Sequence, residues 1–530
     1  MARKKSKAAE AAAQAAESTP RKKAAPKRAA KKAAPKKASA RKTAANKSGE
    51  DAGSKRKVRS TLPAWTPPPP AAPEVLERVE AETQRLGRDL WGHLDRRQPS
   101  VFERRWWLDH ILKWAMQDES VKVQMFRFVD VLPMLKTSES IARHLKEYFD
   151  EVATHLPLAV RLGLEVSEPD SLLGKALAVN ARTNARKMAE RFITGSNSNE
   201  IFQSVTKLRK QGVAFTLDLL GEAVVSEDEA DAYQQAYLNL INELAPLVDN
   251  WPHDELLDHD DHGAIPRAQV SLKLSALYSR FKPIDPEGSS EGVKKRLRPI
   301  FRAARKRHVH VHVDMEHYAF KDLTLQIFKE ICSEDEFRDW PDCGIVIQAY
   351  LPEAERDLHD LRQWVEERGT PVCVRLVKGA YWDYETVVAE YRGWPCPVYR
   401  EKWQSDANFE RQTEFLMRNR DWLRPAIASH NLRSLAHAIA WASELNVPED
   451  AWEIQMLHGM ADEQQHLFSQ LGYRVRVYAP FGEFLPGMAY LVRRLLENTS
   501  NDSFLRHAYE RDADIGELLK APAKHEAAPV

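Results

Sequence analysis

Residues 372–383 read VCVRLVKGAYWD, an apolar run that ends in charged and aromatic side chains. The part from Val372 to Val377 is rich in β-branched residues and almost uninterrupted, which is typical of a parallel strand buried on both faces. Arg375 lies inside it, and a cation buried there needs a ligand or a carboxylate as its partner. The segment therefore predicts a core strand whose carboxyl end brings charge to a pocket, although a purely structural ion pair would give the same pattern.

Seven further β-rich runs alternate with longer amphipathic stretches from residue 212 onward. They are VAFTLDLL (213–220), QVSLKLS (269–275), VHVHVDM (309–315), GIVIQAY (344–350), AIASHN (426–431), WEIQMLH (452–458) and RVRVYAP (474–480). Eight strand-and-helix units over about 290 residues match the count and length of a (β/α)8 TIM-like barrel, an α/β fold. In that fold the chemistry lies at the carboxyl ends of the strands.

Polar side chains gather at those strand ends. At or just beyond them stand Asp218, Glu222, Lys273, Asp314, Gln348, Arg375, Lys378, Ser429, His430, Gln455, His458 and Tyr478. Arg493 and Arg494 follow the eighth strand on an expected helix, where adjacent residues point about 100° apart. With Lys273 they form a cationic trio suited to gripping a carboxylate, the alternative being ordinary surface charge.

The charge of the chain is unevenly distributed. The 530 residues carry a formal net charge of +1, but residues 1–60 hold 20 Lys and Arg against 4 Asp and Glu. This first segment has almost no large apolar side chain, so we expect a disordered basic tail. It would bind nucleic acid or another polyanion nonspecifically, unless it is only a solubilising segment.

Composition divides the remainder into four parts. We expect a proline-rich linker at 61–73, a helical arm at 74–200, the barrel at 201–510 and a polar C-terminal tail at 511–530. Apolar residues recur at helical spacing in this arm, for example at 102–117 and 141–156. Without a signal peptide or a run of about 20 apolar residues, the protein is expected to be cytoplasmic.

Two local patterns have alternative readings. His310, His312 and Asp314 share one face of the third strand, as the ligands of a metal-dependent barrel hydrolase would, but the first strand of the barrel lacks histidine. The four cysteines, Cys332, Cys343, Cys373 and Cys396, form no zinc pattern and no expected disulfide framework. The loop at 259–262, HDDH, is expected to face solvent.

In sequence the chain resembles the proline dehydrogenase domain of the proline utilization A family. The segments that carry the resemblance are LDLLGEA (217–223), SLKLSAL (271–277), VDMEH (313–317), IQAY (347–350), VRLVKGAYWD (374–383), SHN (429–431), LHGM (457–460), YAP (478–480) and YLVRRLLEN (490–498). Members of this family are FAD enzymes that oxidise L-proline to 1-pyrroline-5-carboxylate, the first step of proline catabolism to glutamate. The resemblance implies the same activity here.

The resemblance also implies a role for individual residues. Asp314 and Arg375 would act in catalysis, Arg375 near flavin N5. The substrate would be bound by Lys273, Arg493, Arg494, Tyr381, Tyr478, Leu457 and Glu222. FAD would contact Met315, Gln348, Arg375, Val377, Lys378, Gly379, Ala380, Trp382, Ser429, His430, Asn431, Gln455 and Glu497. In the family, the tyrosine that matches Tyr478 disfavours 4-hydroxyproline.

The expected partners follow from the same resemblance. Reduced flavin would pass its electrons to a quinone, with peripheral contact at the inner face of the membrane. Bifunctional members continue into an aldehyde dehydrogenase, for which we expect no counterpart in this sequence. The product would then pass to a separate pyrroline-5-carboxylate dehydrogenase, or this chain would be the first part of a split pair. The competing interpretation is a catalytically inert barrel whose polyanion-binding tail is the functional part.

Overall fold

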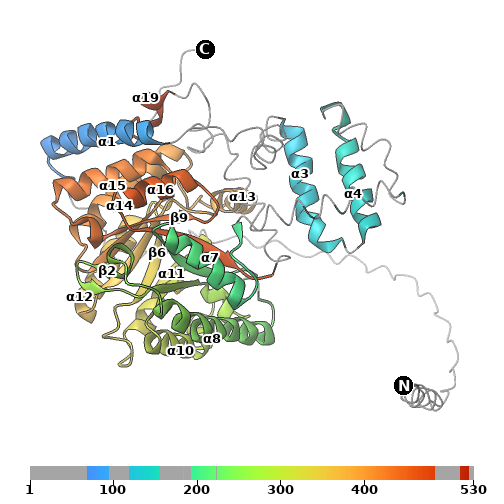
Figure 1. The fold of residues 1–530 in the computed structure, drawn as a ribbon, viewed down its shortest axis with the longest axis horizontal. Helices are drawn as coiled ribbons and strands as arrows, with labels where there is room; N and C mark the ends of the chain where they lie inside the picture. Colours follow the sequence, from blue (N-terminus) through green and yellow to red (C-terminus); the bar gives the residue numbers. More distant parts are fainter. Residues whose placement is uncertain are drawn as a thin grey trace, which may run out of the picture. The chain divides into compact units, whose positions relative to one another are not determined.

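A computed structural model describes residues 69–94, 118–135, 137–155, 192–221, 224–483 and 514–523, together with Ser171, Val179 and Thr183. Its largest part is a closed barrel of eight parallel strands (Figure 1). The strands are β1 (Val213–Leu219), β4 (Ala268–Leu272), β5 (Val309–Val313), β6 (Cys343–Gln348), β7 (Val372–Val377), β8 (Leu423–Ala428), β9 (Glu453–Leu457) and β10 (Val475–Phe481). The predicted (β/α)8 fold is therefore confirmed, and the predicted strand ends differ from the observed ones by at most three residues.

Strand order follows chain order around the barrel. Each strand pairs with its neighbours in sequence, and β1 closes the sheet by pairing with both β4 and β10. In the closing register Leu217 stands opposite Val270, and Asp218 stands opposite Ser271. Because all strands run in the same direction, their carboxyl ends meet at one mouth of the barrel.

Side chains alternate between two environments along each strand. On β5, Val309, Val311 and Val313 are buried in the apolar core, whereas His310 and His312 occupy the alternate positions. On β4, Val270 and Leu272 belong to the same core, whereas Gln269 and Ser271 alternate with them. The apolar layer thus lies between sheet and helices, and the polar positions line the barrel interior.

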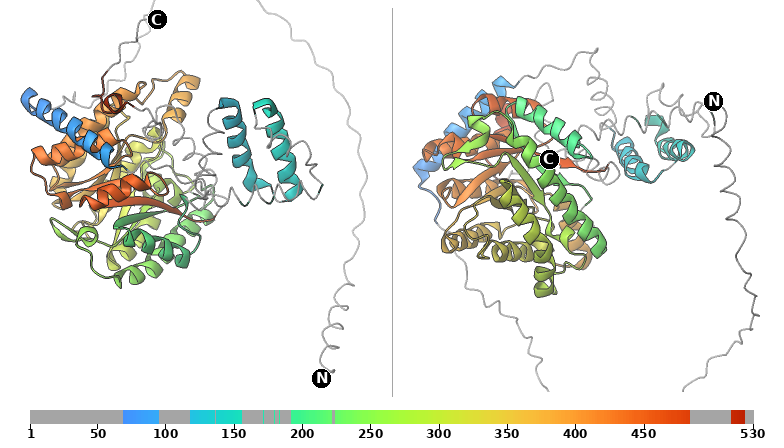
Figure 2. Two further views of the ribbon diagram at one scale, coloured as in Figure 1. Left: turned by 45° about the horizontal axis from the view of Figure 1, so that its top comes forward. Right: turned by 60° about the horizontal axis from the view of Figure 1, so that its bottom comes forward.

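Helices surround the barrel, as the two further views in Figure 2 also show. They are α8 (Glu227–Asp249), α10 (Pro286–Lys306), α11 (Tyr318–Cys332), α12 (Ala354–Arg368), α13 (Trp382–Arg392), α14 (Lys402–Arg418), α15 (Leu432–Glu444) and α16 (Asp462–Gln470), with α7 (Ser198–Lys210) preceding β1. Capping side chains begin several of them. Ser226 and Glu229 form a capping box on α8, and Asn431 accepts a hydrogen bond from Ser434 N at the start of α15.

Helix α1 (Pro73–His93) packs along α15 (Figure 1). Arg433 of α15 ties the two together, because Nη2 lies 2.8 Å from Glu80 of α1 and Nε lies 2.8 Å from Glu410 of α14. Part of the C-terminal segment 511–530, for which the sequence predicts a polar tail, also packs against α1. It contains the short helix α19 (Ile515–Leu518), and the side chain of Leu519 is fully buried against Gly87 of α1.

Two further helices, α3 (Glu119–Val131) and α4 (Ser138–Asp150), pack against each other around Phe128, Ile141 and Phe149. The rings of Phe128 and Phe149 meet edge to face, 6.3 Å apart. Helix α4 confirms most of the helix predicted at 141–156, whereas the stretch at 102–117 lies outside the described residues.

One local prediction is correct only in part. We expect residues 259–262 to face solvent, and Asp261 and His262 do so in an exposed turn, but His259–Asp260 (β2) pairs antiparallel with Gly263–Ala264 (β3) in a small hairpin. Asp260 is buried in this hairpin, and Arg424 approaches its carboxylate at 3.8 Å. None of the described helices combines the length and the apolar character needed to cross a bilayer.

Candidate active site

A buried polar network occupies the carboxyl-end mouth of the barrel. Lys273 and Asp314 directly follow β4 and β5, Arg375 lies in β7, and Tyr478 lies in β10. These strands are spread around the barrel, so only its closure brings the four side chains together. The side chains of Lys273, Asp314 and Arg375 are each less than a tenth exposed.

Asp314 is the centre of this network. Its Oδ1 accepts a hydrogen bond from Arg375 Nη1 at 2.5 Å, and its Oδ2 accepts one from the Tyr478 hydroxyl at 2.6 Å. Lys273 Nζ lies 3.5 Å from the same Oδ2. A buried carboxylate is costly unless it is paired, and Asp314 meets that requirement with two cations and a phenol.

Arg375 has a partner on each nitrogen of its guanidinium group. Besides the Asp314 pair, Nε donates to Gln455 Oε1 at 2.6 Å and Nη2 donates to Ser271 Oγ at 2.8 Å. The guanidinium also lies over the Tyr478 ring, 5.3 Å from its centroid. The orientation of this cation is therefore fixed by β4, β9 and β10 together.

Lys273 lies between two carboxylates. Its Nζ donates to Asp218 Oδ1 at 2.9 Å and also stands 3.4 Å from the Tyr478 hydroxyl. Burial raises the pKa of Tyr478 well above its ordinary value, and the negative charges of Asp218 and Asp314 raise it further. Tyr478 is therefore a neutral hydrogen-bond donor at physiological pH.

Sequence reasoning missed the residues that support this network from within the barrel. Ser271 hydrogen-bonds Thr216 at 2.9 Å as well as Arg375, and Glu453 accepts from Gln455 Nε2 at 2.6 Å. Arg476 Nε in turn lies 2.9 Å from Glu453 Oε1. The alternation of side chains along a strand could have revealed them, because residues two apart share a face. Ser271 therefore lies on the same face as Lys273, and Glu453 on the same face as Gln455.

The backbone just after β7 packs closely against the ring of Tyr350. Gly379 has a φ of 134°, and a Cβ there would lie 2.4 Å from the Tyr350 ring, so only glycine fits. Before it, Lys378 forms an ion pair with Asp406. After it, the Trp382 side chain, on a residue 42% exposed, donates from Nε1 to Tyr399 O at 2.8 Å. Residues 377–381 are partly or fully exposed, so this segment borders open space at the mouth.

Other predicted contact residues lie at neighbouring strand ends. His430 Nε2 accepts a hydrogen bond from Leu457 N at 3.0 Å, and Ser429 Oγ accepts one from Asn431 N at 3.0 Å. Met315 is buried. Gln348 donates to Glu316 O at 3.1 Å, whereas its buried Oε1 has no partner among the described residues. Glu222, Arg493, Arg494 and Glu497 lie outside the described residues.

The three metal ligands considered for a barrel hydrolase, His310, His312 and Asp314, do not form one cluster. In the part of the chain that the structure describes, only His310, His312 and Cys373 bring possible metal ligands together, and Asp314 is not one of them. Asp314 is instead engaged by Arg375 and Tyr478. This geometry does not support the hydrolase alternative.

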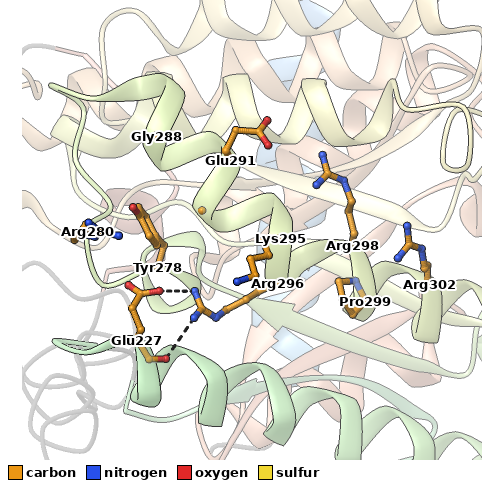
Figure 3. Close-up of a pocket in the computed structure, with 11 residues that line it drawn as sticks. Glu227, Tyr278, Arg280, Gly288, Glu291, Lys295, Arg296, Arg298, Pro299 and Arg302 are labelled. Carbon is orange, nitrogen blue, oxygen red and sulfur yellow. Dashed lines mark hydrogen bonds and ion pairs between the residues drawn. The ribbon is translucent and has the colours of Figure 1, made fainter.

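A pocket of about 700 Å³ lies elsewhere, on the helical layer (Figure 3). It is bordered by Glu227 at the start of α8, by Tyr278 and by residues of α10. Arg296 beside it donates to Glu227 Oε2 at 2.8 Å and to Asp231 Oδ1 at 2.6 Å, which joins α10 to α8. None of the strand-end network lines this pocket, so we assign the candidate site to the barrel mouth.

Comparison with known proteins identifies the family. The family model for proline dehydrogenase matches residues 201–507, and that for the proline utilization A N-terminal domain matches residues 80–192. This chain belongs to the proline dehydrogenase family. The family match covers all eight barrel strands and every residue of the network around Asp314.

Relatives within this family differ in length. Proline dehydrogenase 1 of Bacillus subtilis (strain 168) is 28% identical over 342 residues, which cover 64% of this chain and 96% of that protein. Bifunctional protein PutA of Escherichia coli (strain K12) is 30% identical over 347 residues, which cover 64% of this chain and 25% of that protein. The chain thus matches about a quarter of the length of these PutA relatives.

Solved structures agree with the proline dehydrogenase assignment. One solved structure is that of proline utilization A from Bdellovibrio bacteriovorus, a protein that was inactivated by N-propargylglycine. It is 43% identical to this chain, with a TM-score of 0.77. That match covers 84% of this chain and 44% of the solved one. A bifunctional proline utilization A protein at 22% identity and a TM-score of 0.65 supports the fold.

Proposed function

We propose that this chain oxidises L-proline to 1-pyrroline-5-carboxylate by hydride transfer from C5 to a bound FAD. The observation that carries the proposal is the buried Lys273–Asp314–Arg375–Tyr478 network at the carboxyl ends of strands in a proline dehydrogenase barrel. Catalytic groups in this fold come from the ends of several different strands, as these four do.

Substrate binding needs a cationic grip on the carboxylate and apolar walls for the ring. Lys273 supplies one cation, and we propose that Arg493 and Arg494 supply two more, with Glu222 pairing to this cluster. Tyr381, Leu457 and Tyr478 would enclose the pyrrolidine ring. A cationic pocket also disfavours the charged form of the substrate amine, which must be neutral when C5 gives up its hydride.

The residues at the mouth fit a flavin. The buried Oε1 of Gln348, which has no partner among the described residues, and the partly or fully exposed residues 377–381 are available to a ligand, and FAD would supply the hydride acceptor. Arg375 offers a fixed positive charge that would stabilise negative charge arising beside it. The proposed contacts are Met315, Gln348, Arg375, Val377, Lys378, Gly379, Ala380, Trp382, Ser429, His430, Asn431, Gln455 and Glu497.

The remaining partners extend the proposal. Electrons would pass to a quinone-type acceptor at the inner face of the membrane, and the product to a separate pyrroline-5-carboxylate dehydrogenase. The basic segment 1–60 would bind nucleic acid or another polyanion nonspecifically, through its charge. Its removal should leave turnover with a soluble quinone unchanged while it weakens retention on heparin.

The visible spectrum of the purified protein tests the central proposal. Under anaerobic conditions L-proline should bleach the band of oxidised flavin, whereas D-proline and 4-hydroxyproline should leave it largely unchanged. A protein without flavin, or with flavin that L-proline does not reduce, would contradict the proposal. It would also return the inert-barrel interpretation to consideration.

A further inference from the structure

A row of three residues crosses the barrel wall just below the Asp314–Arg375 pair. His312 of β5 stands opposite Gly344 of β6, and Gly344 stands opposite Cys373 of β7. A Cβ on Gly344 would lie 2.6 Å from both Cε1 and Nδ1 of His312. Because Gly344 has no side chain, the His312 ring occupies the space above β6, on the side of Cys373.

His310 completes a cluster of three potential ligands. It lies two residues before His312 on the same face of β5, and the two rings are stacked with centroids 5.7 Å apart. Ligand atoms of His310, His312 and Cys373 all lie within 4.8 Å of one another. Because the cluster combines residues from two strands, no sequence spacing reveals it.

The two imidazoles have unused nitrogen atoms. Nε2 of His310 and Nε2 of His312 are buried, and neither has a hydrogen-bond partner within the described ranges. His312 is fully buried, and the side-chain amide of Gln269 contacts its Nδ1 at 3.3 Å. With the amide turned so that its oxygen accepts from Nδ1–H, the lone pair of the ring lies on Nε2, which is the tautomer that a metal-binding histidine uses.

We propose that His310, His312 and Cys373 bind one divalent metal ion of the zinc class. Two imidazole nitrogens and a thiolate are donors that this class of metal favours. Tetrahedral bonds of about 2.0 Å to nitrogen and 2.3 Å to sulfur need donor atoms roughly 3.3–3.5 Å apart, so the longest separation in the cluster would have to shorten by up to about 1.3 Å. Water would take the fourth position.

The charges around the cluster allow a cation to enter. Arg375, Arg476 and Arg424 lie close enough to influence the two histidines, but each has a carboxylate partner, Asp314, Glu453 and Asp260 respectively. Cys373 is a buried thiol, so metal binding would release its proton to solvent.

A bound ion would have a structural consequence independent of the oxidation proposed above. Asp314 follows His312 by two residues, and Arg375 follows Cys373 by two. The ion would join β5 and β7 directly below the two residues whose spacing the active site needs. Metal binding to the native fold should therefore raise the thermal stability of the protein.

Cobalt titration of the untagged full chain, first treated with a chelator, tests the site. Co²⁺ should bind with one ion per chain and produce a thiolate-to-cobalt charge-transfer band after subtraction of any flavin spectrum, and Zn²⁺ should displace it. Cys373→Ser should abolish the band and weaken binding by at least about tenfold. Cys396→Ser is the matched control and should bind as the unchanged protein does.

Thermal denaturation supplies a second readout. Zn²⁺ should raise the Tm of the unchanged protein and of Cys396→Ser, but not that of His310→Gln. The His310 variant keeps the test valid if Cys373→Ser does not fold. Absence of the charge-transfer band at saturating Co²⁺, or the same band in Cys373→Ser, would overturn the proposal and leave buried water as the partner of the two imidazoles.

Discussion

Asp314 and Arg375 meet across β6, with Arg375 Nη1 2.5 Å from Asp314 Oδ1. The carboxylate follows β5 and the guanidinium lies in β7, so the pair links two strands that do not touch in the sheet. Removing one member of such a buried pair leaves the other uncompensated, which is strongly destabilising. Here Lys273 and Tyr478 would still contact Asp314 if Arg375 were lost, so the network tolerates tests of Arg375.

Arg375→Met should slow flavin reduction by L-proline by roughly 10²-fold, because it removes the positive charge that we place beside the flavin. It should also lower the reduction potential of the flavin. Stopped-flow reduction and a dye-coupled potential titration measure the two effects. Arg375→Lys, which keeps the charge, should recover most of the potential; equal potentials in all three proteins would refute this role.

Tyr478→Phe removes the hydroxyl that donates to Asp314 at 2.6 Å and lies 3.4 Å from Lys273. Loss of a hydrogen bond to a charged group costs about 1.5–3 kcal/mol, so kcat/KM for L-proline should fall by about 10- to 100-fold. The preference for L-proline over 4-hydroxyproline should narrow. Tyr473→Phe, outside the network, is the control, and an unchanged preference in Tyr478→Phe would show that the hydroxyl does not set specificity.

Ser271→Ala tests a positioning residue that sequence reasoning missed. Its Oγ accepts from Arg375 Nη2 at 2.8 Å, so alanine would free one edge of the guanidinium. We expect kcat to fall by about five- to tenfold, in line with one lost hydrogen bond, while KM stays nearly constant. Steady-state kinetics separate the two parameters. The control is Ser275→Ala, since Ser275 hydrogen-bonds Glu316 instead, and a rise in KM alone would contradict a role through Arg375.

The sequence predicts the barrel because each strand combines an apolar outer face with a polar end, a pattern visible in VCVRLVKGAYWD and in VHVHVDM. Lys273, Asp314 and Arg375 follow from the rule that chemistry gathers at strand ends. The rule does not say which side chains pair, because partners such as Ser271 and Gln455 come from strands about a hundred and about eighty residues away from Arg375.

Contacts between distant segments could not be predicted from local sequence patterns either. Leu519 lies in a polar stretch, yet it is buried because Gly87 leaves space for it on α1. Asp260 lies in a run of charged residues, yet the β2–β3 hairpin turns it inward. Such contacts depend on where the chain returns in space, and periodicity within one segment carries no information about that.

Glu453 predicts how the barrel responds to acid. Burial alone would raise its pKa, but the guanidinium groups of Arg476 and Arg474 together lower the pKa of Glu453 from 4.5 to about 2. This lowered value means that the ionised form stabilises the fold. The contribution is complete above about pH 4.5 and is lost as the pH falls through about 2. The difference corresponds to about 3 kcal/mol.

Glu453→Gln should therefore lower the free energy of unfolding by about 3 kcal/mol or more at neutral pH, since it also leaves two buried arginines without their anion. The difference in unfolding free energy between the variant and the unchanged protein should be smaller at about pH 3. At that pH the unchanged protein has itself lost part of the stabilisation from ionised Glu453. Urea unfolding at the two pH values measures both. Glu336→Gln, which breaks the exposed pair with Arg302, should cost less than about 1 kcal/mol. An equal loss at both pH values would mean that Glu453 acts through packing rather than through its charge.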